Sequence, residues 1–317
     1  MGNIGPMIDD EGVLDPWVEE WFAANPMMRH PFDELSPELL ALARAPLGAP
    51  PTREIARVRD EVIAGVPVRV YQHDQAPTGL VVYFHGGGFC IGSVGLMDNV
   101  ARELAHHTDA AVISVEYRLA PEHPFPAGLD DCEAVTRWAL AHAADLGASL
   151  DHVVVAGESA GGNLAAVVAL RLRGAVDPPL AGQVLVYPVV DRAGAYPSRG
   201  QFDGVVSSAK MGKAFHDAYT SGRPLDRDPF VSPLHAETLA GLPPAIVVLA
   251  GCDMLRDEGR AYARRLHDDG VAVEEVRCAG QPHGFLNFGF PAAGPAYGRI
   301  GTFVRGLLGP SEAAQVS

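Results

Sequence analysis

Short apolar segments alternate with helical patterns through most of this chain, and this alternation constrains its fold more than any other feature. The runs 81–84 (VVYF) and 153–155 (VVV) carry no charge, as is typical of strands buried on both faces of a parallel sheet. Helical patterns stand between the strands at 98–107, 130–146 and 160–173. Because parallel strands are joined by crossover helices, this order predicts an α/β fold with a doubly wound, mostly parallel sheet.

The same reading predicts the remaining elements. Strands are expected at 54–63, 66–73, 80–84, 111–117, 152–156, 182–190, 245–250 and 272–278. Further helices are expected at 14–22, 36–45, 208–220, 258–269 and 296–308. Asp15 and Ser36, each followed by a proline, are the predicted N-caps of the first two helices.

Two stretches do not follow the alternation. Residues 1–50 are rich in aromatic residues, prolines and acids, and residues 191–243 are rich in Pro, Gly and Asp around a single helix. Irregular insertions over a parallel sheet often form a lid. We therefore expect one main domain from 51–190 and 244–317, with a helical lid supplied by 1–50 and completed by 191–243.

Composition narrows the class of protein. The 317 residues, 48% of them apolar, are enough for one large domain with a substantial core. The net charge of −15 disfavours nucleic acid and anionic membrane surfaces as partners. The four cysteines show no C-x-x-C spacing, and residues 1–11 lack a basic region followed by an apolar run. A cytoplasmic protein with reduced thiols is the expectation.

Residues 157–161 form a G-x-S-x-G pentapeptide between an apolar strand and a helical pattern. In that context a sharp turn lifts the Ser159 hydroxyl out of the sheet, and the flanking glycines permit the strained backbone. The helix N-terminus then lies beside the negative charge that develops during attack. Ser159 is the predicted nucleophile, and an ordinary serine at a glycine-rich turn is the alternative.

The segment 85–89 (HGGGF) directly follows a predicted strand. Its consecutive glycines leave backbone N–H groups unobstructed, so that they can converge on an oxyanion. The N–H of Ala160, just after the nucleophile, is a further candidate donor. A flexible glycine loop is the alternative. A phosphate-binding loop fits less well, because no Lys-Ser/Thr pair follows.

The base and the acid are expected downstream of the nucleophile. Four histidines follow it, of which His216 and His267 fall within predicted helices and His235 in the irregular insertion. His283 follows the last predicted strand, where a loop can swing its ring over the edge of the sheet. His283 is therefore the predicted general base.

Asp253 stands just after the predicted strand 245–250, where a carboxylate can hold the imidazole of the base in the required tautomer. Asp191, after an earlier strand, is its topological rival. Asp257 lies four residues further on, and Asp257 and Glu258 are expected to cap the following helix. Asp253 is favoured as the acid.

Together these motifs resemble the hormone-sensitive-lipase family of α/β-hydrolases, in its bacterial esterase branch. The matching segments are HGGGF at 85–89, YRLAPEH at 117–123, GESAGGNLA at 157–165, SPL at 232–234, GLPP at 241–244, D-x-L-R-D-E-G at 253–259 and HGF at 283–285. They occur in order, and the N-terminal helices are similar to that family's lid.

The resemblance implies an α/β-hydrolase fold and a serine hydrolase that needs no cofactor. It implies the triad Ser159, Asp253 and His283, with Gly87, Gly88 and Ala160 as the donors of the oxyanion hole. Two positions depart from the family pattern: Met254 replaces the proline usual after the acid, and Glu158 stands where many members have Asp. Neither departure changes a triad side chain.

Aromatic side chains in the two irregular stretches and in the glycine loop are the candidates for contact with substrate. They are Trp21, Phe22, Phe89, Phe215 and Tyr219. Phe215 and Tyr219 share one helical face with Met211. Simple packing is the alternative for this stripe. If the inserts form a lid, some of these side chains should line an acyl pocket.

The predicted activity is hydrolysis of short- to medium-chain carboxylic esters through an acyl-enzyme. We expect a small-molecule ester substrate, no metal, no organic cofactor and no membrane or nucleic-acid partner, since no His/Cys/Asp cluster has metal-ligand spacing. Amide hydrolysis, lactone opening and acyl transfer use the same groups and remain alternatives. A receptor of this fold is the alternative outside catalysis, although such receptors have lost the base. A homodimer would use the last strand and helix.

Overall fold

The computed structural model describes residues 12–29, 34–45 and 49–308, and its centre is one eight-stranded sheet in the order β1-β2-β4-β3-β5-β6-β7-β8. The strands are β1 (Arg57–Ile63), β2 (Val66–Gln72), β3 (Leu80–Phe84), β4 (Ala111–Val115), β5 (Val153–Glu158), β6 (Gly182–Val186), β7 (Ala245–Cys252) and β8 (Val273–Pro282). Strand β2 runs antiparallel to both of its neighbours, and the pairs from β4 through β8 are all parallel.

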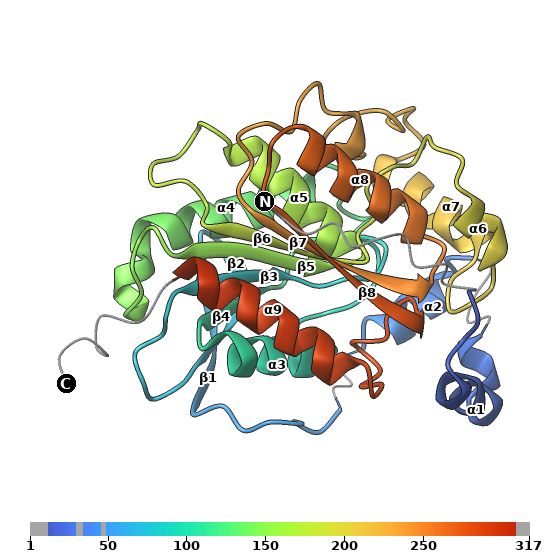
Figure 1. Cartoon of the computed structure of the whole chain (residues 1–317), viewed down its shortest axis with the longest axis horizontal. Coiled ribbons are helices and arrows are strands. Elements are labelled where there is room, and N and C mark those ends of the chain that lie inside the picture. Colours follow the sequence, from blue (N-terminus) through green and yellow to red (C-terminus); the bar gives the residue numbers. More distant parts are fainter. Residues whose placement is uncertain (1–11, 30–33, 46–48, 309–317) are drawn as a thin grey trace.

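Helices cover both faces of this sheet (Figure 1). One face carries α3 (Asp98–Thr108) and α9 (Ala293–Leu308), and the other carries α4 (Ala127–His142), α5 (Ala160–Leu172) and α8 (Arg256–Asp268). The short 3₁₀ turn η2 (Ala143–Leu146) continues α4. The expected α/β fold with a doubly wound, mostly parallel sheet is thereby confirmed.

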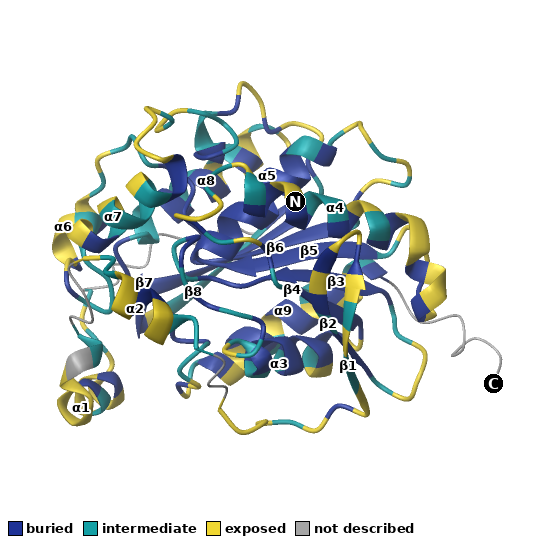
Figure 2. Ribbon diagram, turned by 180° about the vertical axis from the view of Figure 1, so that it is seen from behind, coloured by how far each residue is buried: buried dark blue, intermediate teal, exposed yellow. Residues whose placement is uncertain are grey.

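Side chains of the central strands alternate between two cores. Val82 and Phe84 of β3 pack into the core under α4 and α5, while Val81 and Tyr83 pack into the core under α3 and α9. Successive side chains of a pleated strand point to opposite faces, and both faces of these strands are apolar. Figure 2 shows the central strands as buried, whereas β1 at the edge carries exposed residues. The triad loops therefore rise from a rigid platform.

Short helices gather at the end of the sheet toward which β8 points (Figure 1). They are α1 (Pro16–Ala24), α2 (Pro37–Ala43), α6 (Pro197–Gln201) and α7 (Ala209–Thr220), with the 3₁₀ turns η1 (Pro26–Met28) and η3 (Pro233–His235). Three of them begin at a side-chain cap: Asp15 accepts from the Trp17 N–H, Ser36 from the Leu39 N–H and Ser208 from the Met211 N–H. Capping oxygens satisfy N–H groups that have no partner within the helix.

Several boundaries differ from expectation, and two strand ends differ by four residues. Strand β6 ends at Val186 and not at residue 190, because Pro188 has no N–H to continue a ladder. Strand β8 continues to Pro282, since the pairing with β7 shifts register between Ala250 and Cys252 and resumes there. Helix α6 was not predicted. Residues 1–11, where no basic region followed by an apolar run was found, lie outside the described residues.

No helix in the described part of the chain is long and apolar enough to cross a bilayer.

Candidate active site

Ser159 occupies the turn between β5 and α5 in a backbone conformation that few L-residues adopt. Its φ is 57° and its ψ is −118°. A β-carbon on Gly157 would collide with the Gly161 carbonyl, and one on Gly161 would collide with the Phe84 carbonyl. Both flanking positions must therefore be glycine for the turn to pack against β3. The turn holds the Ser159 side chain above the carboxyl end of the sheet.

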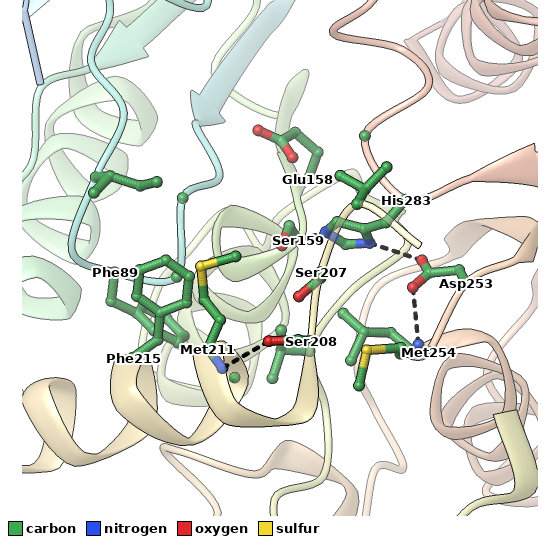
Figure 3. Close-up of a pocket in the computed structure, with 18 of the residues that line it drawn as sticks. Phe89, Glu158, Ser159, Ser207, Ser208, Met211, Phe215, Asp253, Met254 and His283 are labelled. Atoms are coloured by element: carbon green, nitrogen blue, oxygen red, sulfur yellow. Dashed lines mark hydrogen bonds and ion pairs between the residues drawn. The ribbon is translucent and has the colours of Figure 1, made fainter. Parts of the chain in front are cut away.

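His283 bridges Ser159 and Asp253. Its Nε2 lies 2.9 Å from Ser159 Oγ, and its Nδ1 lies 2.7 Å from Asp253 Oδ2. Figure 3 shows the ring between the two side chains, with the Asp253 hydrogen bond as a dashed line. Asp253 follows β7 and His283 follows β8, and these two strands are neighbours in the sheet. Adjacent parallel strands therefore bring the two loops together at one edge.

Asp253 is a buried acceptor whose position is fixed by a backbone hydrogen bond. It is 1% exposed, and its Oδ1 accepts a hydrogen bond of 2.9 Å from the Leu255 N–H. Burial disfavours the charged form of His283, but the Asp253 carboxylate, together with the charges of Glu158 and Glu258, outweighs this effect, and the pKa of His283 is raised above its ordinary value. The pair is thus suited to stabilise an imidazolium during a reaction.

The glycine loop after β3 turns sharply beside Ser159. Gly87 has φ of 115° and Gly88 has φ of 59°, and the N–H groups of Cys90 and Ile91 both bond to the Gly87 carbonyl. A β-carbon on Gly87 would strike the Ile91 carbonyl.

Within the described residues, the N–H groups of Gly87 and Gly88 donate to no acceptor of the protein. Both glycines line the same cavity as Ser159. Ala160, the residue after Ser159, begins α5. Free backbone N–H groups at this place can donate hydrogen bonds to an oxyanion and so stabilise its negative charge.

Glu158 is a buried carboxylate whose contacts sequence reasoning missed. It accepts a hydrogen bond from the Gly86 N–H, and its side chain also bonds to Asn287. Burial raises the pKa of Glu158, while the positive potential of His283 and these hydrogen bonds lower it. Glu158 thus ties the glycine loop to the loop after His283. One sequence feature could have indicated such contacts: Glu158 is a charged residue at the end of an apolar strand, directly before the nucleophile.

A cavity of about 450 Å³ opens above Ser159. Its walls are mostly apolar and include Phe89, Met211, Phe215 and Phe288. Figure 3 places Phe89, Met211 and Phe215 on one side of Ser159, with His283 and Asp253 on the other. Of the aromatic residues expected to contact substrate, Phe89 and Phe215 line this cavity.

The other three aromatic candidates lie behind the cavity wall. Phe22 is 2% exposed and belongs to the buried cluster that also contains Phe285 and Phe290. Tyr219 is also 2% exposed and stacks on Phe89 at 3.8 Å between ring centroids. Trp21 packs against Phe288 at 5.2 Å. The helical stripe and the first helix therefore place these rings in packing contacts, and Tyr219 and Trp21 support residues that do face the cavity.

The rival acids and bases have other partners. Asp191 Oδ1 lies 2.8 Å from His235 Nε2, and its other oxygen accepts from the Tyr196 hydroxyl. His216 pairs with Asp226 at 2.8 Å, and His267 lies beside Asp268 on α8.

Asp257 and Glu258 do not cap α8 as expected. Asp257 accepts from the Ser198 N–H, and Glu258 accepts from the Val190 N–H and pairs with Arg199. The reason is that α6 and the loop after β6 pack against the first turn of α8 and supply donors to both carboxylates.

Comparison with known proteins gives a consistent picture. A family model described as the α/β hydrolase fold matches residues 81–287. Esterase LipI of Mycobacterium tuberculosis is 36% identical over 94% of this chain and 97% of its own length. Carboxylesterase NlhH of the same organism is 41% identical over 75% of this chain and 77% of its own length. The solved structure of a hyperthermophilic esterase from Pyrobaculum calidifontis aligns with a TM-score of 0.84 at 34% identity, covering 93% and 98% of the two chains.

Proposed function

Because the chain belongs to the hormone-sensitive-lipase family of α/β-hydrolase-fold carboxylesterases, we propose that its substrates are short- to medium-chain acyl esters, hydrolysed by Ser159, His283 and Asp253. The observation that carries the assignment of these three residues is the unbroken chain of hydrogen bonds from Asp253 through His283 to Ser159, 2.7 and 2.9 Å long. Both distances lie in the range that proton transfer requires.

In the proposed mechanism, neutral His283 takes the Ser159 proton as Oγ attacks the ester carbonyl. The imidazolium that forms is stabilised by the Asp253 carboxylate. His283 then returns the proton to the departing alkoxide, which leaves an acyl group on Ser159. A water molecule repeats the two steps and releases the acid.

The backbone N–H groups of Gly87, Gly88 and Ala160 are the proposed oxyanion hole. The first two lack an acceptor within the described part of the protein, and all three stand next to Ser159. Donors that are fixed before the reaction need no reorganisation when charge develops on the carbonyl oxygen. Glu158 supports this arrangement by holding the Gly86 N–H.

The size of the cavity supports the proposed substrate range. A volume of about 450 Å³ lies at the lower end of the range for small-molecule pockets and suits a modest acyl chain. Two lid segments would set this size: we propose that α1 and α2 from residues 1–50, and α6 and α7 from 191–243, close over the site as a lid on the catalytic domain. Trp21 of α1 packs against Phe288, which lines the cavity, and this contact supports a position of α1 beside the site.

Turnover of p-nitrophenyl esters from acetate to palmitate tests the proposal, with Ser159→Ala measured beside the wild type. We expect rates that peak at short or medium chains and fall to background in the variant. Comparable rates on butyrate and palmitate would contradict the proposed chain-length limit. Activity that survives in Ser159→Ala would contradict the nucleophile.

We also propose that any homodimer forms through β8 and α9. Strand β8 lies at the edge of the sheet, so its outer side has no partner strand within the described chain. Light scattering on the purified protein, with and without a proline in β8, tests this surface.

A further inference from the structure

Arg192 places a positive charge at the wall of the catalytic cavity. The chain leaves β6 at Val186 and passes directly over the nucleophile, where the Val189 N–H donates to the Ser159 carbonyl at 3.2 Å. Arg192 follows three residues later, and both it and Val189 line the cavity that contains Ser159. Its backbone is fixed by a hydrogen bond of 3.0 Å from its N–H to Ser232 Oγ.

The Arg192 guanidinium is anchored on one side and unpaired on the other. Its Nη2 donates to the Gly212 carbonyl of α7 at 2.8 Å, which holds the group at the wall of the cavity that α7 forms. Its Nε is buried without an acceptor. Among the described residues, no carboxylate lies within ion-pair distance of Arg192. Arg192 is only partly exposed, and an arginine charge shielded from bulk water is ordinarily balanced by such a partner.

The carboxylates whose charges act on Arg192 are engaged elsewhere. Glu258 pairs with Arg199 at 2.6 Å, and Asp226 pairs with His216 at 2.8 Å. Asp191 accepts from Tyr196 and His235.

Arg199 makes the contrast clear, because it also lines the cavity but its charge is met directly by Glu258. Burial lowers the pKa of Arg192, and the distant charges of Glu258, Asp226 and Asp191 compensate only in part. A substrate without a negative group would leave the Arg192 charge at the cavity wall without a counter-ion, at a cost in binding.

We propose that Arg192 is a specificity-determining residue that binds a carboxylate carried by the ester substrate. The substrate class is then an ester with a second, free carboxylate, such as a half-ester of a dicarboxylic acid. This inference rests on the proposed ester hydrolysis. The guanidinium offers a planar pair of donors, the geometry that carboxylates match. The apolar part of the substrate that carries this carboxylate would contact Met211, Gly212 and Phe215 of α7.

The test compares two methyl esters of matched shape, monomethyl glutarate and the neutral methyl 5-methylhexanoate. Wild type, Arg192→Met and Arg192→Lys are assayed by proton release, and the ratio of the two kcat/KM values is the readout. A charge-assisted hydrogen bond is worth enough that Arg192→Met should lower the ratio of anionic to neutral ester by about tenfold or more. Arg192→Lys should retain part of the preference for the anionic ester.

Arg137→Met is the matched control. Arg137 is an exposed residue of α4 that pairs with Glu133, so its removal deletes the same charge away from the cavity. Its ratio should equal that of the wild type. An equal ratio in Arg192→Met, with the neutral ester still hydrolysed, would overturn the proposal. Failure of the wild type on both esters would instead contradict the ester hydrolysis on which the proposal rests.

A second pair, 4-acetoxybenzoate beside phenyl acetate, places the carboxylate on the alcohol side. A ratio that depends on Arg192 in only one pair assigns the guanidinium to that side of the scissile bond.

Inhibition of the wild type by glutarate needs no variant, so it still tests the proposal if Arg192→Met fails to fold. Glutarate should inhibit hydrolysis of the neutral ester competitively and at lower concentration than 5-methylhexanoate. The reverse order would overturn the proposal.

Discussion

Two aspartate–histidine pairs stand at the carboxyl end of this sheet, and they have different surroundings. Asp253 with His283 and Asp191 with His235 are separated by 2.7 and 2.8 Å, and both aspartates are almost completely buried. Both aspartates also follow parallel strands, β7 and β6.

The difference lies in what surrounds each pair. Beyond His283 stands Ser159 Oγ at 2.9 Å, facing a cavity. Asp191 is surrounded by further donors, the Tyr196 hydroxyl and the N–H groups of Ala193 and Gly194. A carboxylate fully satisfied by fixed donors stabilises a loop, whereas one whose histidine has a nucleophile on its other nitrogen can assist catalysis. Substitutions in the two pairs should therefore have different effects.

The largest effect is expected from His283→Ala. Without the ring, no other side chain among the described residues bonds to Ser159 Oγ to take its proton, and kcat should fall on the order of 10⁵–10⁶-fold. Steady-state hydrolysis of p-nitrophenyl butyrate measures it. The counterpart, His235→Ala, should keep kcat within about threefold of wild type. A similar loss in both variants would show that the two pairs are not functionally distinct.

Asp253→Asn should lower kcat by roughly 10⁴-fold, since an amide cannot stabilise the imidazolium and permits the wrong tautomer of His283. The matched change Asp191→Asn should instead lower stability. It weakens several charge-assisted hydrogen bonds, each worth about 1.5–3 kcal/mol, while activity per folded molecule stays near that of wild type. Chemical denaturation and active-site titration separate the two effects. A stable but inactive Asp191→Asn would assign Asp191 a part in the chemistry.

Acid should affect the two pairs at different pH. The raised pKa of His283 means that the neutral base is lost, and kcat/KM falls, as pH drops through a value above the ordinary one of about 6.5. The stabilisation from protonated His283 is present below about pH 6.5 and disappears as pH rises through the raised pKa.

The pKa of Asp191 is lowered: burial opposes this, but its hydrogen bonds to Tyr196 and His235 outweigh burial. Its contribution to stability is therefore present above about pH 3.9 and lost only as pH falls further. Activity should thus decline reversibly on acidification while circular dichroism still reports a folded protein. Unfolding that coincides with the loss of activity would contradict this order.

The smallest effect is expected from His235→Gln. Asp191 keeps its bonds to Tyr196 and two backbone amides, and the glutamine amide can replace the lost donor, so the free energy of unfolding should change by about 1 kcal/mol or less. Denaturant titration measures this change. A larger loss would show that the His235 ring contributes more than one replaceable donor.

The sequence was sufficient for the sheet and for the identity of the candidate triad members, but it left Asp191 as a rival of Asp253. Both residues follow apolar strands, and only the strand order separates them: β8, which carries His283, pairs with β7 and not with β6. Strand order depends on long-range pairing, which local apolar patterns do not encode.

Contacts between distant segments were beyond prediction for the same reason. Glu258 looked like a helix cap, yet it bonds to the Val190 N–H and to Arg199 because the insertion folds over α8. Trp21 and Phe22 share a short helix whose orientation is set by packing against Phe288 and Phe290, and this orientation turns both rings away from the cavity. Local patterns identify which residues form a helix, whereas the face turned to a cavity follows from tertiary packing.

The turn at Ser159 has a consequence for how stability and activity are related in this molecule. A positive φ at a non-glycine residue costs of order 1–3 kcal/mol, and this cost comes from the β-carbon and not from the hydroxyl. Alanine at position 159 therefore keeps the strain and loses only the nucleophile, which makes it a clean chemical control. Glycine would release the strain. The protein thus keeps its most reactive side chain at a position where a different, inactive residue would fit its backbone better.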